Sequence, residues 1–214
     1  MTVAGMGGLG SCSSLLLAAA GVGHITNIDS GVVELSNLNR QVLYCDKDLG
    51  REKVTVARKV LSRLNPKIEV VPVSAKKTGG NVSSLIKDAQ VVVDGMDNLP
   101  DRMNVNEACV RRGVPFGYGG IYGLRGMVST IIPRITACLA CICSQIPESS
   151  RVIPVLGTVS ALVGELQALE TVKLLSGIGT SLADKMLFFD GGHARFHYFS
   201  ISKDKNCEIC SEAY

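Results

Sequence analysis

Charge is scarce in this sequence. Charged residues make up 19% of the 214 residues, and the formal net charge of +3 at pH 7 does not predict binding to nucleic acid or to a membrane surface. Long apolar runs are also missing: the longest, Leu15 to Val22, falls far short of the roughly 20 residues that cross a bilayer. No basic segment precedes an apolar one at the N-terminus, so we expect no signal peptide and a cytoplasmic protein.

Hydrophobic residues, in contrast, are plentiful. They make up 46% of the sequence, which is typical of a folded protein with a large buried core and excludes a disordered chain. A chain of this length is expected to form one domain. Since no internal repeat or composition shift divides it, we interpret residues 1–214 as a single domain.

Short apolar segments alternate with helical patterns along most of the chain. The predicted strands are Thr2–Ala4, His24–Asp29, Ile68–Val73, Val91–Asp94, Val114–Gly117 and Gly126–Ile132. The predicted helices are Ser11–Ala20, Glu52–Leu64, Arg102–Arg112 and Gly157–Leu175. This alternation predicts an α/β fold with a mostly parallel sheet and helices on both faces. The polar stretch Ser144–Pro154 predicts an exposed loop, and Lys185–Phe189 with Ala194–Ile201 predicts a final antiparallel hairpin.

A glycine-rich loop follows the first predicted strand. Gly5, Gly7, Gly8 and Gly10 fit the pattern G-x-G-x-x-G between a strand and a helix, and Asp29 lies 19 residues after Gly10, at the end of the second strand. Such a loop lets the backbone approach a phosphate at a helix N-terminus, and the acid can bind a ribose hydroxyl. The alternative is that the glycines only allow tight packing of strand against helix. The order of all these parts favours a nucleotide.

Four polar residues near the predicted strand ends distinguish an ATP-binding site from an NAD-binding site. Arg40 and Lys53 are cations suited to a polyphosphate, Asp97 is an oxygen ligand suited to Mg²⁺, and Asn37 adjoins Arg40. Each has a structural alternative: Lys53 as a charge on a basic helix, Arg40 in a salt bridge, and Asn37 and Asp97 as helix caps. NAD needs neither two cations nor a magnesium ligand, so the set as a whole predicts MgATP.

Four of the 8 cysteines form two CxxC pairs, namely Cys138 with Cys141 and Cys207 with Cys210. In a cytosolic protein this pattern favours metal over disulfides, and four thiolates match a closed tetrahedral zinc site that fixes the C-terminal tail. The alternative is a pair of redox motifs. It is disfavoured because neither pair is expected to open a helix after a strand. Cys143 adjoins the first pair without belonging to it.

Taken together, these motifs resemble the ThiF/MoeB/HesA family, relatives of the ubiquitin-activating enzymes, and the resemblance runs from Thr2 to Cys210. It implies a Rossmann-like fold and an ATP-dependent adenylyltransferase, usually a homodimer. Such enzymes bind a small ubiquitin-like or sulfur-carrier protein whose tail ends in Gly-Gly. The tail carboxylate attacks the α-phosphate of ATP, giving an acyl-adenylate and pyrophosphate.

The resemblance also implies roles for individual residues. Gly8 is expected against the phosphates, Asp29 at the ribose and Asp97 at Mg²⁺. The expected polyphosphate contacts are Asn37, Arg40 and Lys53. Because the attacking carboxylate is already ionised, no general base is needed. The histidines are therefore expected to be structural: His24, His193 and His197.

Three departures from the family stand out. Ser150 lies near the position where many relatives carry a loop cysteine for thioester or persulfide chemistry, so we expect this chain's chemistry to end at the adenylate. Met1 begins inside the first predicted strand, whereas relatives have an earlier helical segment that supplies an arginine to the partner subunit, so we expect weaker turnover. Gly31 stands where many relatives have a second acid, which leaves the expected ribose contact of Asp29 intact.

Three alternative functions remain open at this point. An NAD-dependent oxidoreductase would explain the glycine loop but not Lys53, Asp97 or the cysteines. A non-catalytic partner subunit of an active relative would explain the fold and the missing N-terminal segment. A relative that adenylates a small molecule or a tRNA-bound carboxylate is also compatible with these residues.

Overall fold

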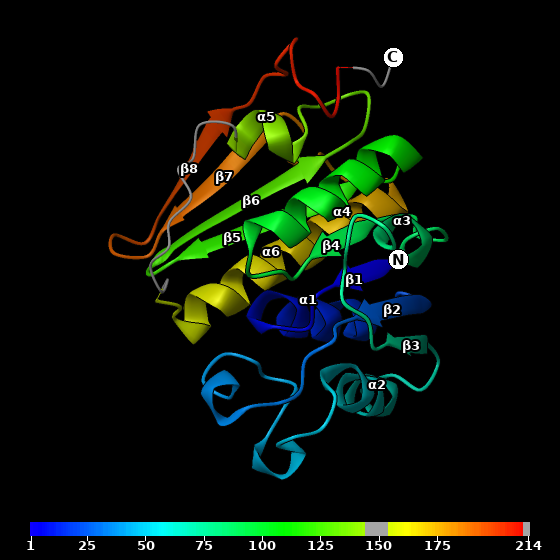
Figure 1. Cartoon of the computed structure of the whole chain (residues 1–214). Helices are drawn as coiled ribbons and strands as arrows, with labels where there is room; N and C mark the ends of the chain where they lie inside the picture. The colour runs from blue at the N-terminus through cyan, green and yellow to red at the C-terminus, as the bar shows by residue number, and fades with distance from the viewer. Residues whose placement is uncertain (144–153, 212–214) are drawn as a thin grey trace.

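The computed structural model describes residues 1–143 and 154–211, and its strands form one eight-stranded sheet (Figure 1). In spatial order the strands run β3-β2-β1-β4-β5-β6-β7-β8. Their bounds are β1 (Thr2–Ala4), β2 (His24–Ile28), β3 (Glu69–Val73), β4 (Val92–Asp94), β5 (Phe116–Tyr122), β6 (Arg125–Ile131), β7 (Lys185–Asp190) and β8 (Arg195–Ser200).

The sheet has a parallel part and an antiparallel part. Strands β3, β2, β1, β4 and β5 pair in parallel, and β5, β6, β7 and β8 pair antiparallel. This confirms the predicted mostly parallel sheet with a C-terminal hairpin. Chain order reverses between β1 and β4, which lie side by side with Val3 opposite Val93. In sheets of this kind ligands bind at such a reversal, outside the carboxyl ends of the strands.

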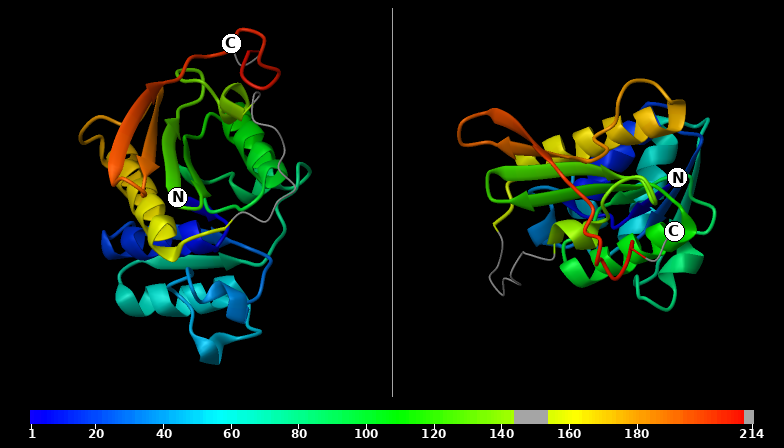
Figure 2. Two further views of the ribbon diagram at one scale, coloured as in Figure 1. Left: turned by 90° about the vertical axis from the view of Figure 1, so that its left-hand side faces the viewer. Right: turned by 90° about the horizontal axis from the view of Figure 1, so that it is seen from above.

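Helices cover both faces of the sheet. Their bounds are α1 (Gly8–Ala19), α2 (Lys53–Leu64), α3 (Val82–Leu85), α4 (Leu99–Arg112), α5 (Leu139–Cys143) and α6 (Gly157–Ser176). Two short 3-10 turns, Leu35–Asn37 and Asp46–Asp48, lie between β2 and α2. Figure 2 shows α6 on one side of the sheet and α4 on the other.

The hydrophobic core follows these two layers. One buried cluster joins α1 and α2 to the parallel strands through Leu17, Ile25 and Leu61. A second cluster joins α4 and α5 to β5 and includes Phe116 and Leu139, and a smaller third cluster packs α6 against β6. Because side chains alternate between the two faces of a strand, the short strands can supply the first two clusters.

Two helices begin earlier than the sequence predicts. α1 starts at Gly8, so the last glycines of the loop form its first turn. α4 starts at Leu99 because the Asn98 side chain accepts a hydrogen bond from the Asp101 amide (2.9 Å) and Pro100 fits the first turn. Its end at Gly113 agrees with the prediction.

Strand β5 is longer than predicted and continues through Gly119 and Gly120 to Tyr122. Glycine is depleted in strands, so local sequence placed the end at Gly117. Here the glycines are needed for packing, because a Cβ on Gly119 would lie 2.5 Å from the Gln167 side chain. The short helices α3 and α5 were not predicted.

No helix in the described part of the chain is long and apolar enough to cross a membrane. Residues 144–153, which include Ser150 and most of the predicted loop Ser144–Pro154, lie outside the described residues.

Candidate functional site

The glycine loop is held by close backbone contacts at the reversal between β1 and β4. Gly5 has a φ of +106°, and a Cβ there would lie 2.5 Å from the Gly95 carbonyl oxygen, just after β4. A Cβ on Gly10 would collide with the Gly5 carbonyl oxygen. Tight packing therefore explains Gly5 and Gly10. It does not explain Gly7, where a Cβ would meet only ordinary contacts.

Asp29 fixes the same loop from the end of β2. Its two carboxylate oxygens accept the Met6 and Gly31 amides, each at 2.7 Å. The buried Tyr44 hydroxyl donates to the Met6 carbonyl at 2.9 Å, and burial raises the pKa of Tyr44. Each carboxylate oxygen can accept more than one hydrogen bond, so Asp29 retains capacity for a ribose hydroxyl.

Arg40 lies against the start of α1. Its Cγ would be 3.4 Å from a Cβ on Gly8, and its Nη1 donates to the Ser36 carbonyl and to Asn39 Oδ1, both at 2.8 Å. No salt bridge of Arg40 occurs among residues 1–143 and 154–211. The structural alternative of an Arg40 ion pair is therefore not found there.

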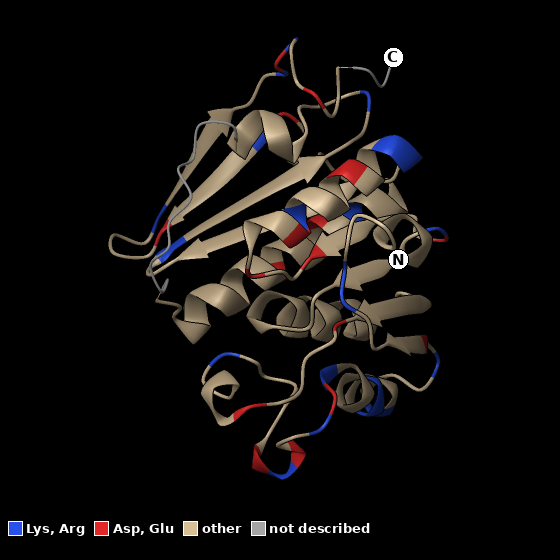
Figure 3. Cartoon of the chain, in the orientation of Figure 1, with Lys and Arg blue, Asp and Glu red and all other residues tan. Residues whose placement is uncertain are grey.

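Lys53 is the first residue of α2, on a helix where lysine and arginine gather (Figure 3). A Cβ added to Gly31 would lie 3.6 Å from Lys53 Nζ and 3.0 Å from Asp29 Oδ1. Lys53, like Arg40, forms no salt bridge within the described ranges. The structure thus brings Asp29 and Lys53 together beside the glycine loop.

Two acids follow β4, and they differ in what they bind. Asp94 is fully buried, accepts the Met96 amide at 2.9 Å and pairs with Arg102 Nε at 2.9 Å. Burial lowers the pKa of Arg102, but Asp94 and Tyr118 together raise it by more, so the pKa of Arg102 is raised and its guanidinium stays charged. Asp97 is exposed and accepts only a 3.3 Å hydrogen bond from Asn98 among the contacts found. Since Asn98 caps α4, Asp97 is not the cap and its carboxylate is available.

Asn37 is placed differently from the other polar residues. Its side chain is buried, and its Oδ1 accepts the Glu34 amide at 3.2 Å, which caps the short turn Leu35–Asn37. For its Oδ1 atom, the structural alternative of a cap is therefore correct. Its Nδ2 makes a longer bond of 3.4 Å to Ser36.

Several residues at this site were missed by sequence reasoning. Arg102, Ser160 and Gln167 come from α4 and α6, far from the glycine loop in the chain. Gln167 donates to the Asp94 and Gly117 carbonyls at 2.8 and 2.9 Å and so ties β4 to β5. Of the residues in these contacts, only Asp94 had a local signal, as the acid that ends the predicted strand Val91–Asp94.

The four CxxC cysteines form one cluster. All four sulfurs lie within 4.8 Å of one another, with Cys138 to Cys207 at 3.6 Å and Cys141 to Cys210 at 3.5 Å. Zinc–sulfur bonds of 2.3 Å in a tetrahedron give sulfur separations of about 3.8 Å. This donor set could hold a metal ion. One expectation was wrong: Cys138 directly precedes α5, so the first pair does open a short helix.

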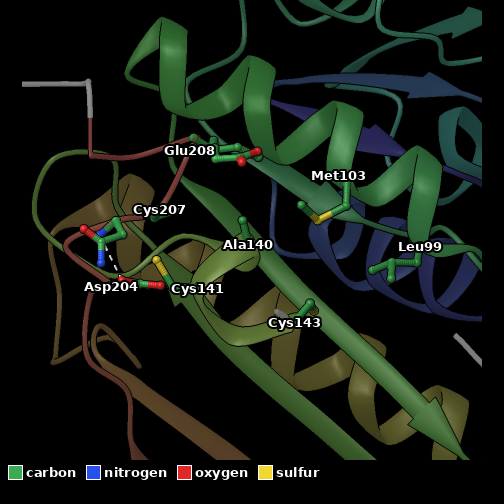
Figure 4. Close-up of a pocket in the computed structure, with 10 residues that line it drawn as sticks. Leu99, Met103, Ala140, Cys141, Cys143, Asp204, Cys207 and Glu208 are labelled. Carbon is green, nitrogen blue, oxygen red and sulfur yellow. Dashed lines mark hydrogen bonds between the residues drawn. The ribbon is translucent and has the colours of Figure 1, made fainter. Parts of the chain in front are cut away.

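A cavity of about 330 Å³ lies beside this cluster rather than at the glycine loop. Leu99 and Met103 line it from α4, as Figure 4 shows. Ile209 lines it from the C-terminal segment. Cys143 also lines it, and burial raises the pKa of its thiol, which disfavours the reactive thiolate.

Comparison with known proteins gives one consistent group. A family model described as the ThiF family matches residues 1–209. The SAMP-activating enzyme E1 of Haloferax volcanii is 37% identical over 217 residues, covering 99% of this chain and 80% of that protein. The sulfur carrier protein adenylyltransferase of Thermus thermophilus is 36% identical, covering 99% and 82%.

A solved structure shows the same fold. Escherichia coli MccB with ATP has a TM-score of 0.86 and 24% identity. The match covers 98% of this chain and 65% of the MccB chain, so this chain spans just under two thirds of that protein's length.

Proposed function

The chain belongs to the ThiF family, and on that premise we propose that it uses ATP to adenylate the C-terminal carboxylate of a small ubiquitin-like or sulfur-carrier protein. The products are an acyl-adenylate and pyrophosphate. The names of two relatives, a SAMP-activating enzyme and a sulfur carrier protein adenylyltransferase, support this substrate class. The observation that supports the proposal is that the glycine loop, the Arg40 and Lys53 cations and the exposed Asp97 carboxylate all follow or adjoin the carboxyl ends of β1, β2 and β4, and that neither cation forms a salt bridge with a residue the structure describes.

In this proposal the nucleotide lies along that edge. The first-turn amides of α1, around Gly8, would bind phosphate, because these N–H groups have no acceptor within the helix and carry the positive end of its dipole. Asp29 would bind the ribose. Arg40, Lys53 and the Nδ2 of Asn37 would bind the polyphosphate. An NAD-dependent reaction would leave Lys53 and Asp97 without a role.

The chemistry asks the protein to bring two anions together. A carboxylate attacking a phosphate is already ionised at neutral pH, so the residues must neutralise charge rather than move a proton. Arg40 and Lys53 supply positive charge, and Asp97 is the residue that would hold Mg²⁺. When bound, that ion would offset charge on the phosphate oxygens and on the departing pyrophosphate.

Zinc is the metal that four thiolates at these separations fit best, in a closed site that leaves no position for catalysis. We treat residues 1–214 as one adenylation domain of a cytoplasmic homodimer. Its carrier protein would end in Gly-Gly, as family resemblance implies.

ATP–pyrophosphate exchange tests the reaction directly. With candidate carriers that end in Gly-Gly, we expect exchange that depends on the carrier. It should fall by about a hundredfold or more in Asp97→Ala, because Asp97 is proposed to hold the cation that stabilises the developing charge. Asp101→Ala, at an acid in the first turn of α4, is the control and should retain most of the exchange. Absence of ATP binding by calorimetry with Mg²⁺ present would rule the proposal out.

A further inference from the structure

The first turn of α6 meets the glycine loop at the place where Arg40 lies. A Cβ on Gly8 would collide with Ser160 Oγ, and Arg40 packs against the same glycine. A Cβ on Gly157, the first residue of α6, would collide with the Asn39 carbonyl oxygen and lie 3.3 Å from Arg40 Cα. The N-terminal ends of α1 and α6 therefore converge, with Arg40 in contact with both.

Neither helix is neutralised at its N-terminus by a side chain of its own cap or first turn. Gly7 caps α1 and Leu156 caps α6, neither helix has a side-chain cap, and neither has an acid in its first turn. Each end carries N–H groups without intrahelical acceptors and the positive pole of a helix dipole. Two such poles and a guanidinium group repel one another unless an anion lies between them.

Ser160 adds an independent observation. Its side chain is fully buried, and its hydroxyl has no hydrogen-bond partner among the residues that the structure describes. The other buried hydroxyl on α6, that of Thr171, donates to the Gln167 carbonyl at 2.8 Å. Buried hydroxyls are nearly always paired, so an unpaired one aimed at the glycine loop indicates a ligand.

We propose that the first turn of α6 is a second phosphate-binding element of the nucleotide site. The Ser160 hydroxyl and the amides of Gly157 and Thr158, which have no acceptor within the helix, bind the phosphate chain together with the first turn of α1. The inference rests on the proposed function and extends it to residues outside the glycine motif. Because Ser160 contacts Gly8, the anion it meets is the one that the glycine loop holds.

Calorimetry with MgATP and with adenosine tests this proposal. Ser160→Ala and the volume-matched Ser160→Cys both lack a strong donor. Each should weaken MgATP binding about tenfold, the effect of one hydrogen bond to a charged group. Adenosine binding should stay unchanged, because it has no phosphate. Thr171→Val removes a buried hydroxyl from the same helix and should leave both ligands unaffected, and thermal unfolding of each variant checks that it is folded.

Three other results would contradict the inference, and they differ in what they imply for the proposed function. Wild-type affinity for MgATP in both Ser160 variants, with binding weakened in Lys53→Ala, would overturn the inference and leave the proposed function standing. Unchanged ATP binding with slower adenylation of a Gly-Gly-ended carrier would overturn it in favour of a carboxylate contact. A wild-type protein that binds no MgATP would overturn the proposed function and this inference together.

Discussion

Arg40 and Lys53 bring positive charge to the edge of the sheet beside the glycine loop, and no carboxylate within residues 1–143 and 154–211 forms a salt bridge with either of them. Lys53 lies close to Asp29, yet both oxygens of that carboxylate accept backbone amides. Exposed ion pairs contribute little to stability, so the absence of one says little about folding. The absence of an ion pair matters for function, because a cation without a carboxylate partner can bind phosphate.

Lys53→Ala is therefore expected to weaken MgATP binding about tenfold at low salt, by loss of one charge contact to the phosphates. Lys59→Ala removes the same charge from an exposed position of the same helix and should leave affinity unchanged. Calorimetry at two salt concentrations measures both. Equal losses in the two variants would show that the general charge of α2, rather than a contact of Lys53, sets the affinity.

Asp94 and Asp97 show why residue type alone does not define a role. They are three residues apart, yet one is buried against Arg102 and the other is exposed. Burial of a carboxylate requires a paired cation, and Arg102 supplies it from α4. Of these two acids, the exposed Asp97 is the one that we propose for a metal ion.

At the scale of elements, the end of α4 depends on the backbone conformation of a single glycine. Gly113 has a φ of +70°, and a Cβ there would meet nothing within 4 Å. Gly113→Ala therefore costs only backbone strain, about 1 kcal/mol of the free energy of unfolding.

Gly23→Ala is the matched control for that substitution. A Cβ on Gly23 also meets nothing within 4 Å, and its φ lies outside the left-handed region. Denaturant unfolding should show a loss for Gly113→Ala and no loss for Gly23→Ala. Equal stability of the two variants would contradict the account of the α4 end.

At the scale of the whole molecule, the cysteine cluster connects distant parts of the chain. Cys138 and Cys141 lie at α5, whereas Cys207 and Cys210 follow the last strand. A metal ion bound there would link the C-terminal segment to the α4–α5 layer. Metal binding to such a site contributes directly to folding.

We expect one zinc per chain by elemental analysis, and we expect chelation to lower the melting temperature. Chelation should also make the segment 202–206 susceptible to protease. Cys207→Ala should behave like the chelated protein, and Cys45→Ser, at an exposed cysteine outside the cluster, should behave like wild type. A metal-free preparation with unchanged melting temperature and protease resistance would count against a structural metal ion at the cysteine cluster.

The sequence by itself determined the parts whose physics is local. A glycine spacing between a strand and a helix, an acid at a strand end, two CxxC pairs and alternating apolar segments each report short-range geometry. They were sufficient for the fold class and the family, and they supplied the candidate residues that remain predictions. Helix starts shifted by about three residues because capping by Asn98 and the helical turn after Gly7 depend on backbone geometry.

Tertiary structure alone decided which polar residues are free and which are committed. Arg102 neutralises Asp94, Asn98 leaves Asp97 available, and Ser160 reaches Gly8 from a helix about 150 residues further along the chain. Gly119 is needed within β5 because the Gln167 side chain from α6 lies where a Cβ would be. The reason is physical: the state of a buried charge or hydroxyl depends on its partners in space, and no local pattern records them.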